Sequence, residues 1–171
     1  MNTNLNVTKA LKEVQLEEQV LVKILESNGQ RALFAKKAFH KEECIFPFSS
    51  RLTMDAPSYL TLQINDNTHI LINPIALECV NHSCEPNCFF DIENYELIAL
   101  CDIAQGEELK FFYPSTEWCM DQGFQCNCGS SSCLQHINGA YSIPIHEIKR
   151  YRLSPFIKAK LDLLGSKDSN L

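Results

Sequence analysis

Apolar and polar residues alternate in short runs along most of this chain, and clusters of turn-forming residues separate one run from the next. This pattern is typical of a mainly β fold made of many short strands. Asn65-Asp66-Asn67 and Ile92-Glu93-Asn94 are predicted to turn two hairpins, because each interrupts an apolar run with turn-forming residues. The predicted strands span residues 19–26, 31–39, 43–48, 59–64, 69–72, 87–91, 95–101 and 109–113.

Helical spacing is found only near the two ends of the chain. Thr8 is a suitable cap for a short helix over residues 8–18, within an N-terminal extension that we assign to residues 1–18. A second helix is predicted to begin at Ser154-Pro155, with the serine as N-cap, and to end at Gly165.

Composition and charge indicate an ordinary globular protein of 171 residues, with 45% hydrophobic and 21% charged residues. The net charge of −6 argues against direct nucleic-acid binding, because phosphate contact needs clustered cations. The negative charge fits attraction of a basic partner, although solubility alone explains it equally well. The sequence has neither an apolar run of about 18 residues nor an apolar core near its start, so we expect no membrane partner and no export.

Nine cysteines are unusual in a chain of this length, and their odd number without an export signal argues against a disulfide framework. We therefore expect a reducing intracellular compartment, the cytoplasm or a nucleus. Cys44, Cys79 and Cys101 lie in apolar or strand-like runs and are predicted to act as small buried hydrophobic residues.

The spacing Cys126-x-Cys128-x4-Cys133 predicts a zinc site, because Gly, Ser and Asn between the cysteines let the chain curl around an ion. Three thiolates leave a tetrahedral structural site one ligand short. The alternative is a set of unpaired thiols on a flexible tail, which would oxidise readily. The candidates for the fourth ligand are Cys84, Cys88, Cys119 and His136.

A second unusual segment, Asn81-His82-Ser83-Cys84-Glu85-Pro86-Asn87, places polar groups between two apolar runs. Taken alone, it fits a turn fixed by the proline. A cysteine–histidine nucleophile pair is a weaker alternative, because adjacency in sequence does not supply the geometry of a pair.

Together these segments resemble the SET domain, the fold of protein-lysine methyltransferases. Residues 81–87 match the most diagnostic motif of that family, and Gly106-Glu107-Glu108-Leu109-Lys110-Phe111-Phe112-Tyr113 resembles its second motif, which ends in the catalytic tyrosine. The late cysteines resemble the zinc-binding post-SET tail, and residues 112–118 look like those of a compact, microbial-type subgroup. The resemblance implies a SET domain over residues 19–118, a post-SET segment over 119–140 and a C-terminal helical segment over 141–171.

The implied fold consists of small sheets around a pseudoknot that brings Asn81, His82 and Tyr113 together beside S-adenosylmethionine. Asn81 and His82 would hold the polar and adenine ends of this cofactor. The resemblance also implies that Cys84 is the fourth zinc ligand, beside Cys126, Cys128 and Cys133. The remaining implied cofactor contacts are the backbone of Arg31, Ala32 and Leu33, and the side chain of Leu134 against the adenine.

Two phenylalanines are expected in the substrate channel. Phe111 stands where the family places the aromatic residue that governs product multiplicity, and a ring without a hydroxyl implies that more than one methyl group is added. A phenylalanine of the core is the simpler alternative, because strand alternation also points it inward. Phe48 replaces a tyrosine that is common in relatives. The family's Gly-x-Gly is replaced here by Gln30-Arg31-Ala32.

The implied chemistry is methyl transfer from S-adenosylmethionine to a lysine side chain of a protein. A lysine amine, with an ordinary pKa of ~10.4, attacks only when it is neutral, and an apolar channel next to a sulfonium lowers that pKa. Tyr113 would then orient the amine, although a tyrosine of the core is the alternative for an isolated strand end. Two other functions stay open: methyl transfer to a small-molecule amine, and a non-catalytic binding module.

Overall fold

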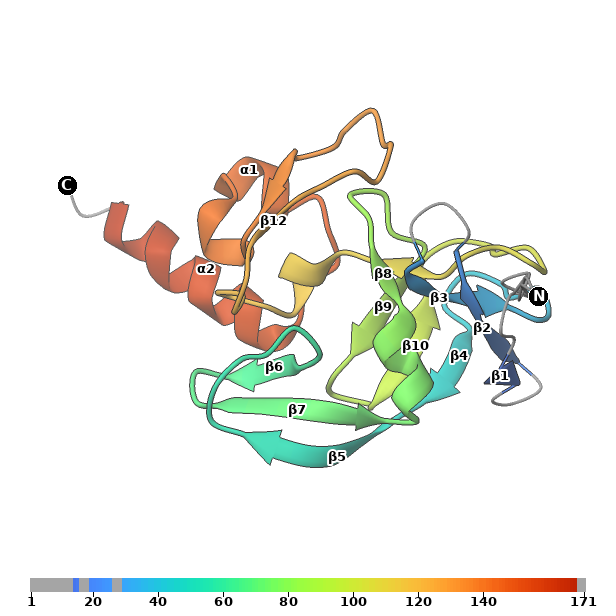
Figure 1. The fold of residues 1–171 in the computed structure, drawn as a ribbon. Helices are drawn as coiled ribbons and strands as arrows, with labels where there is room; N and C mark the ends of the chain where they lie inside the picture. Colours follow the sequence, from blue (N-terminus) through green and yellow to red (C-terminus); the bar gives the residue numbers. More distant parts are fainter. Residues whose placement is uncertain (1–13, 16–18, 26–28, 169–171) are drawn as a thin grey trace, which may run out of the picture.

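Small sheets, rather than one large sheet, make up this protein (Figure 1). The structure, a computed structural model, describes residues 14–15, 19–25 and 29–168. Three sheets have three strands each, in the orders β1-β2-β3, β4-β10-β9 and β5-β7-β6. Their strands are β1 (Val14–Gln15), β2 (Val20–Ile24), β3 (Arg31–Ala35), β4 (Cys44–Pro47), β5 (Ser49–Met54), β6 (Leu62–Asn65), β7 (Thr68–Asn73), β9 (Cys88–Asp91) and β10 (Glu96–Ala99).

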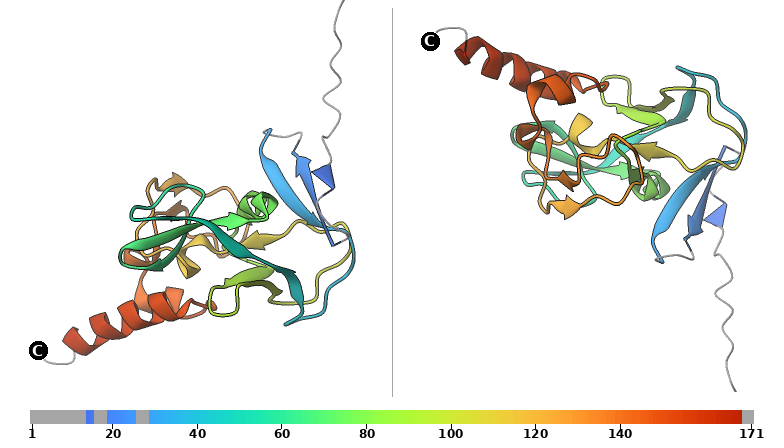
Figure 2. Two further views of the ribbon diagram at one scale, coloured as in Figure 1. Left: turned by 90° about the horizontal axis from the view of Figure 1, so that it is seen from below. Right: turned by 90° about the horizontal axis from the view of Figure 1, so that it is seen from above.

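Two strand pairs and a few short helices complete the described fold. The pairs are β8 (Asn81–His82) with β11 (Lys110–Phe111), and β12 (Phe124–Gln125) with β13 (His136–Ile137). The helices are η1 (Ile75–Cys79), η2 (Tyr113–Ser115), η3 (Ala140–Ser142), α1 (Ile145–Ile148) and α2 (Pro155–Asp168). In Figures 1 and 2, α2 and the sheet β1-β2-β3 lie on opposite sides of the molecule. None of the described helices is long and apolar enough to cross a bilayer.

The predicted mainly β fold is confirmed, and so are both hairpins. β6 and β7 pair antiparallel across the turn that follows Asn65. β9 and β10 pair antiparallel, with Asp91 opposite Glu96 at the end of the ladder next to the turn. The hydroxyl of Ser154 accepts a hydrogen bond from the backbone N–H of Ile157 at 3.3 Å, which is the predicted cap of α2.

Three local predictions were wrong. The last strand ends at Phe111, and Tyr113 begins η2, since Pro114 at the start of a helical turn has the fixed φ that such a turn needs. The helix α2 does not end at Gly165 but continues to Asp168. Val14–Gln15 forms a strand paired with β2 rather than part of a helix, and the rest of residues 8–18 lies outside the described residues.

At the centre of the fold, the second motif (residues 106–113) forms backbone hydrogen bonds with a different segment on each of its two sides, an arrangement that we call the crossing. On one side, β11 runs parallel to β8, and the carbonyl of Lys110 also accepts from the backbone N–H of Asn87 at 3.0 Å. On the other side, the N–H of Leu109 donates to the carbonyl of Leu33 in β3 at 2.8 Å. Residues 81–87 therefore meet residues 107–111 through backbone bonds, although the two segments are distant in sequence.

Apolar side chains from these sheets form the main core, and a second cluster attaches the C-terminal helices. In the second cluster, Phe112 stacks on Tyr151 with ring centroids 3.7 Å apart and an interplanar angle of 8°. Ile148 and Ile157 are fully buried against the same cluster. The C-terminal segment therefore packs directly behind the second motif.

We expect the Ile157→Ala variant to lower the free energy of unfolding by ~2–5 kcal/mol, because the removed atoms leave a cavity in this cluster. Ile157 is 0% exposed. Leu163→Ala on the same helix, where the leucine is 64% exposed, is the matched control and should change stability by less than about 0.5 kcal/mol. Urea unfolding followed by circular dichroism measures both. Equal effects of the two substitutions would show that α2 does not contribute to the core in solution.

Candidate active site

Tyr113 lies where the second motif leaves the crossing. It begins η2, separated from the end of β11 by Phe112, and its ring packs against Phe111 and His82 with centroid distances of 4.7 and 5.2 Å. Its hydroxyl donates to the backbone carbonyl of Val80 at 3.2 Å. Burial disfavours the phenolate and raises the pKa of Tyr113 to about 12, so the hydroxyl keeps its proton at neutral pH.

His82 connects the two motifs through both ring nitrogens. Its Nδ1 accepts a hydrogen bond from the backbone N–H of Tyr113 at 3.3 Å, and its Nε2 lies 3.5 Å from Sγ of Cys84. Burial lowers the pKa of His82 to about 4, so the ring is neutral at pH 7. An acceptor at Nδ1 assigns the proton of this neutral ring to Nε2, which faces the sulfur.

Asn81 is fixed beside the same crossing. Its amide nitrogen donates to the carbonyl of Arg31 and to Oε1 of Glu108, both at 3.1 Å. The first contact joins the start of β3 to β8, and the second joins the two motifs. Residues that are separated in sequence by 50 and 27 positions thus converge at one point.

A cavity of about 440 Å³, which we call the polar cavity, opens at this point. Its volume lies within the range of about 300–1,000 Å³ that is usual for sites that bind small molecules. Both Asn81 and His82 line it, as expected. The full lining is Leu25, Gln30, Asn81, His82, Glu108, Lys110, Tyr113, Phe124, Gln125, Cys126, Asn127 and Cys128.

The other expected cofactor contacts lie around this cavity rather than in its wall. Arg31 contributes its carbonyl to Asn81, whereas Ala32 and Leu33 are fully buried. Leu134 packs beside the late cysteines, and its N–H points to Sγ of Cys84 at 3.4 Å. From this part of the chain, the described residues that line the polar cavity are Leu25 and Gln30.

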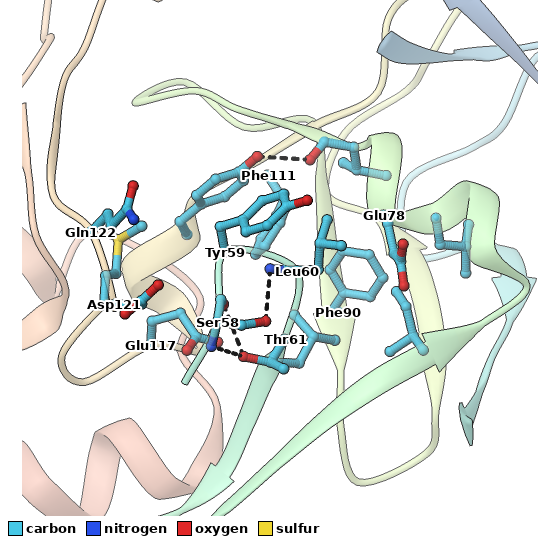
Figure 3. Close-up of a pocket in the computed structure, with 16 residues that line it drawn as sticks. Ser58, Tyr59, Leu60, Thr61, Glu78, Phe90, Phe111, Glu117, Asp121 and Gln122 are labelled. Carbon is cyan, nitrogen blue, oxygen red and sulfur yellow. Dashed lines mark hydrogen bonds between the residues drawn. The ribbon is translucent and has the colours of Figure 1, made fainter. Parts of the chain in front are cut away.

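Tyr113 also lines a second, narrow cavity of about 50 Å³, which we call the aromatic cavity (Figure 3). Phe111 and Phe90 contribute to its wall, and their rings pack edge to face at 4.8 Å. Phe48 is not among the described lining residues. It packs against the ring of Phe90, which does line the cavity, with the two ring centroids 5.5 Å apart. Tyr113 is the only described residue in the walls of both cavities.

Glu117 is a lining residue of the aromatic cavity that the sequence analysis missed. It is only 6% exposed, and its Oε1 accepts from the backbone N–H of Gln63 at 2.8 Å and from the hydroxyl of Thr116 at 3.1 Å. Burial raises its pKa to about 8 despite these two hydrogen bonds. The available signal was a lone acid in the segment Pro114–Trp118, directly after the tyrosine.

Four cysteines meet at the edge of the polar cavity. The sulfur atoms of Cys84, Cys126, Cys128 and Cys133 all lie within 4.8 Å of one another. Tetrahedral zinc with bonds of about 2.3 Å places thiolates about 3.8 Å apart, so the cluster has the size and ligand set of such a site. Of the four candidates for a fourth ligand, the structure brings Cys84 to the other three cysteines.

The surroundings of the cluster suit thiolate ligands. Burial raises the pKa of Cys84 and of Cys126, whereas backbone N–H groups offset burial at Cys128 and lower its pKa to about 6. The N–H groups of Leu134 and Gln135 point to Sγ of Cys84 and Cys133, each at 3.4 Å. Such outer contacts orient metal ligands and stabilise their negative charge.

Comparison with known families decides what this arrangement is. The model of the SET domain matches residues 30–114, which contain both motifs of the crossing. Methyltransferase flvH of Aspergillus flavus is 38% identical over 124 residues, which cover 69% of this chain and 67% of that protein. The chain belongs to the SET-domain family.

Other relatives of this SET domain are much longer histone-lysine methyltransferases. Trithorax of Drosophila virilis is 39% identical over 69 residues, which cover 37% of this chain and 2% of that protein. The H3 lysine-4 specific enzyme of Aspergillus fumigatus is 38% identical over 66 residues, or 34% of this chain and 5% of the enzyme. These relatives identify the chain as a SET-domain methyltransferase, a class that takes its methyl group from S-adenosylmethionine.

Proposed function

We propose that this SET domain transfers a methyl group from S-adenosylmethionine to the side-chain amine of a lysine in a protein. The observation that carries the proposal is the position of Tyr113, in the walls of both cavities. A methyl donor and an acceptor amine that enter from opposite sides would meet in line at this residue. Such alignment is the main requirement of the reaction, since the methyl group of a sulfonium is already electrophilic.

The polar cavity has the size and the polar groups that the cofactor needs. Asn81, His82, Gln30 and Lys110 line it and would hold the cofactor, which supplies the electrophilic methyl group when bound. We assign zinc to the four cysteines at its edge. Because Cys126 and Cys128 also line the polar cavity, a metal there would fix one wall of the cofactor site.

The aromatic cavity suits a slender cationic side chain. A volume of about 50 Å³ admits little besides an aliphatic chain, and apolar walls favour the neutral amine over the ammonium ion. The hydroxyl of Tyr113 already donates its proton to the carbonyl of Val80. Its oxygen lone pairs are therefore available to accept an N–H of the amine and to orient the nitrogen.

Labelled methyl transfer tests the proposal. The zinc-loaded protein would be incubated with methyl-labelled S-adenosylmethionine and either core histones, free lysine or 1,5-diaminopentane, and products would be mapped by mass spectrometry. We expect label on lysines of the histones. Label on the small amines alone would favour a small-molecule methyltransferase. No cofactor binding in a calorimetric titration would favour a non-catalytic binding module.

Phe111→Tyr should reduce the number of methyl groups added to each lysine. A phenol hydroxyl would occupy space in a cavity of about 50 Å³ and would bind the amine or a water molecule, which leaves less room for a methylated nitrogen. We expect dimethyl- or trimethyllysine from the wild type and mainly monomethyllysine from the variant, as measured by intact-peptide mass spectrometry. The same product distribution from both proteins would remove Phe111 from this role.

A further inference from the structure

The carboxyl group of Glu117 is held so that one oxygen atom has no described donor. Both of its hydrogen bonds, from Gln63 and from Thr116, end on Oε1. Within the described part of the chain, no group donates to Oε2. These bonds fix the side chain in the wall of the aromatic cavity, which Tyr113 also lines.

Several acidic side chains and no described basic side chain line the aromatic cavity. Besides Glu117, its described acidic residues are Glu78 and Asp121, and its two tyrosines are Tyr59 and Tyr113. Glu78 is already bonded to Arg51 at 2.7 Å, whereas Asp121 is exposed to solvent. Figure 3 shows Glu117 beside Asp121 on one side of the cavity and Glu78 on the other side. Of the described residues that line the cavity, none is a lysine, an arginine or a histidine.

Burial without a cationic partner opposes ionisation of a carboxyl group, so Glu117 becomes a stable carboxylate only when a cation lies beside it. Hydrophobic replacement of such a group is generally tolerated or stabilising. The structural role that Glu117 does serve is to bond the N–H of Gln63, which a neutral glutamine would serve as well. The carboxyl group is therefore better explained by a cationic group that enters the cavity.

We propose that Glu117 is a further catalytic residue, the base that removes the proton from the acceptor ammonium before methyl transfer. This inference rests on the proposed function, because the cation in question is the protonated amine of the acceptor. The geometry that carries it is the shared cavity: Glu117, whose Oε2 has no described donor, and Tyr113 both line the same narrow space.

The proposed step conserves protons and electrons. The ammonium R–NH₃⁺ gives one proton to the carboxylate of Glu117, which yields R–NH₂ and a carboxylic acid. The nitrogen lone pair then forms the N–CH₃ bond while the methyl–sulfur bond breaks, and the electron pair of that bond stays on the sulfur of the cofactor. The product is a methylammonium ion, and the proton of Glu117 leaves to solvent at the exposed side near Asp121.

The proton affinity of Glu117 supports this role. Burial raises its pKa to about 8, far closer to the pKa of a desolvated amine than that of an exposed carboxyl group. A base whose pKa lies near the working pH is the most effective proton acceptor. Glu117 also follows Tyr113 closely in the chain, and its backbone N–H donates to the carbonyl of Tyr113 at 3.1 Å, so the two residues move as one unit.

The test compares Glu117→Gln with the wild type over pH 6 to 10, with core histones and labelled S-adenosylmethionine. Glutamine keeps the size of the side chain and an acceptor for the N–H of Gln63, but it cannot take a proton. We expect kcat to fall about a hundredfold at pH 7. Below the Glu117 pKa of about 8 both rates should rise with pH, because the wild type needs the ionised carboxylate. Above pH 8 the wild-type rate should level off, whereas the variant needs an amine that has lost its proton to water and should keep rising about tenfold per pH unit, so the deficit should shrink between pH 8 and pH 10. Cofactor affinity and melting temperature should stay unchanged.

Glu93→Gln, at an exposed turn between β9 and β10, is the matched control and should behave as the wild type. Glu117→Asp, which keeps a carboxyl group, should retain more activity than Glu117→Gln. A Glu117→Gln variant with wild-type rates across the pH range would overturn the assignment and leave the proposed function intact. A pH-independent loss would also overturn it, in favour of a structural role. A wild type without transfer to any acceptor would refute both proposals.

Discussion

Replacement of Tyr113 by phenylalanine should lower the rate of methyl transfer about a thousandfold while cofactor affinity changes little. The substitution removes only the hydroxyl, which donates to Val80, from a residue that lines both cavities. Without it, the acceptor amine has no oriented partner next to the transferred methyl group. The loss of one such preorganised group typically costs about 10²–10³-fold in rate.

Single-turnover assays with labelled cofactor measure this effect separately from binding, which calorimetry follows. Tyr141→Phe is the matched control, since that tyrosine is 49% exposed and bonds Asn138 instead. Undiminished transfer by Tyr113→Phe would remove Tyr113 from the reaction. A large loss of cofactor affinity would instead give the hydroxyl a role in binding.

Replacement of Cys84, the proposed fourth zinc ligand, should have the second large effect, on the fold as well as on cofactor binding. We expect one zinc ion per chain in the wild type and none in Cys84→Ser. Binding of structural zinc contributes about 10–16 kcal/mol in small zinc-binding peptides, so its loss should unfold the segment that contains Cys126–Cys133. Because Gln125–Cys128 line the polar cavity, affinity for S-adenosylmethionine should fall with the metal.

Metal analysis, thermal unfolding and calorimetric titration of the cofactor measure these three changes. Cys119→Ser is the matched control, because that cysteine is exposed, lies in the same region of the chain and is not part of the four-sulfur cluster. A Cys84→Ser protein that keeps its metal and its melting temperature would refute the zinc assignment. Full cofactor affinity of a metal-free protein would separate the metal from the cofactor site.

Elements that depend on neighbouring residues could be predicted from the sequence. The hairpins at Asn65 and Asp91 and the start of α2 at Ser154 follow from turn and capping chemistry within a few positions. Gly165 was misread because a glycine inside a helix costs only about 1 kcal/mol relative to alanine, which other contacts can offset. Helix ends are therefore less certain than helix starts.

The candidate site depended on long-range contacts that no local pattern contains. The pairing of Asn81 with Lys110 was expected only from family resemblance, since periodicity does not reveal which strands meet. Family resemblance placed Phe48 in the substrate channel but could not show that Phe90 separates it from the cavity. Glu117 was missed because a carboxyl group looks the same in sequence whether it is buried or solvated.

The backbone crossing at the centre of the fold also constrains the order in which the chain can mature during synthesis. Residues 81–87 find their bonding partners only at residues 107–111, and β3 bonds the same later segment. Contacts of such long sequence separation form late, because the intervening loop must first be closed. On the ribosome, a nascent chain that has emerged only as far as residue 100 still lacks the partners of residues 81–87 and of β3, and it lacks Tyr113. The candidate site can therefore form only after residues 107–113 have left the exit tunnel.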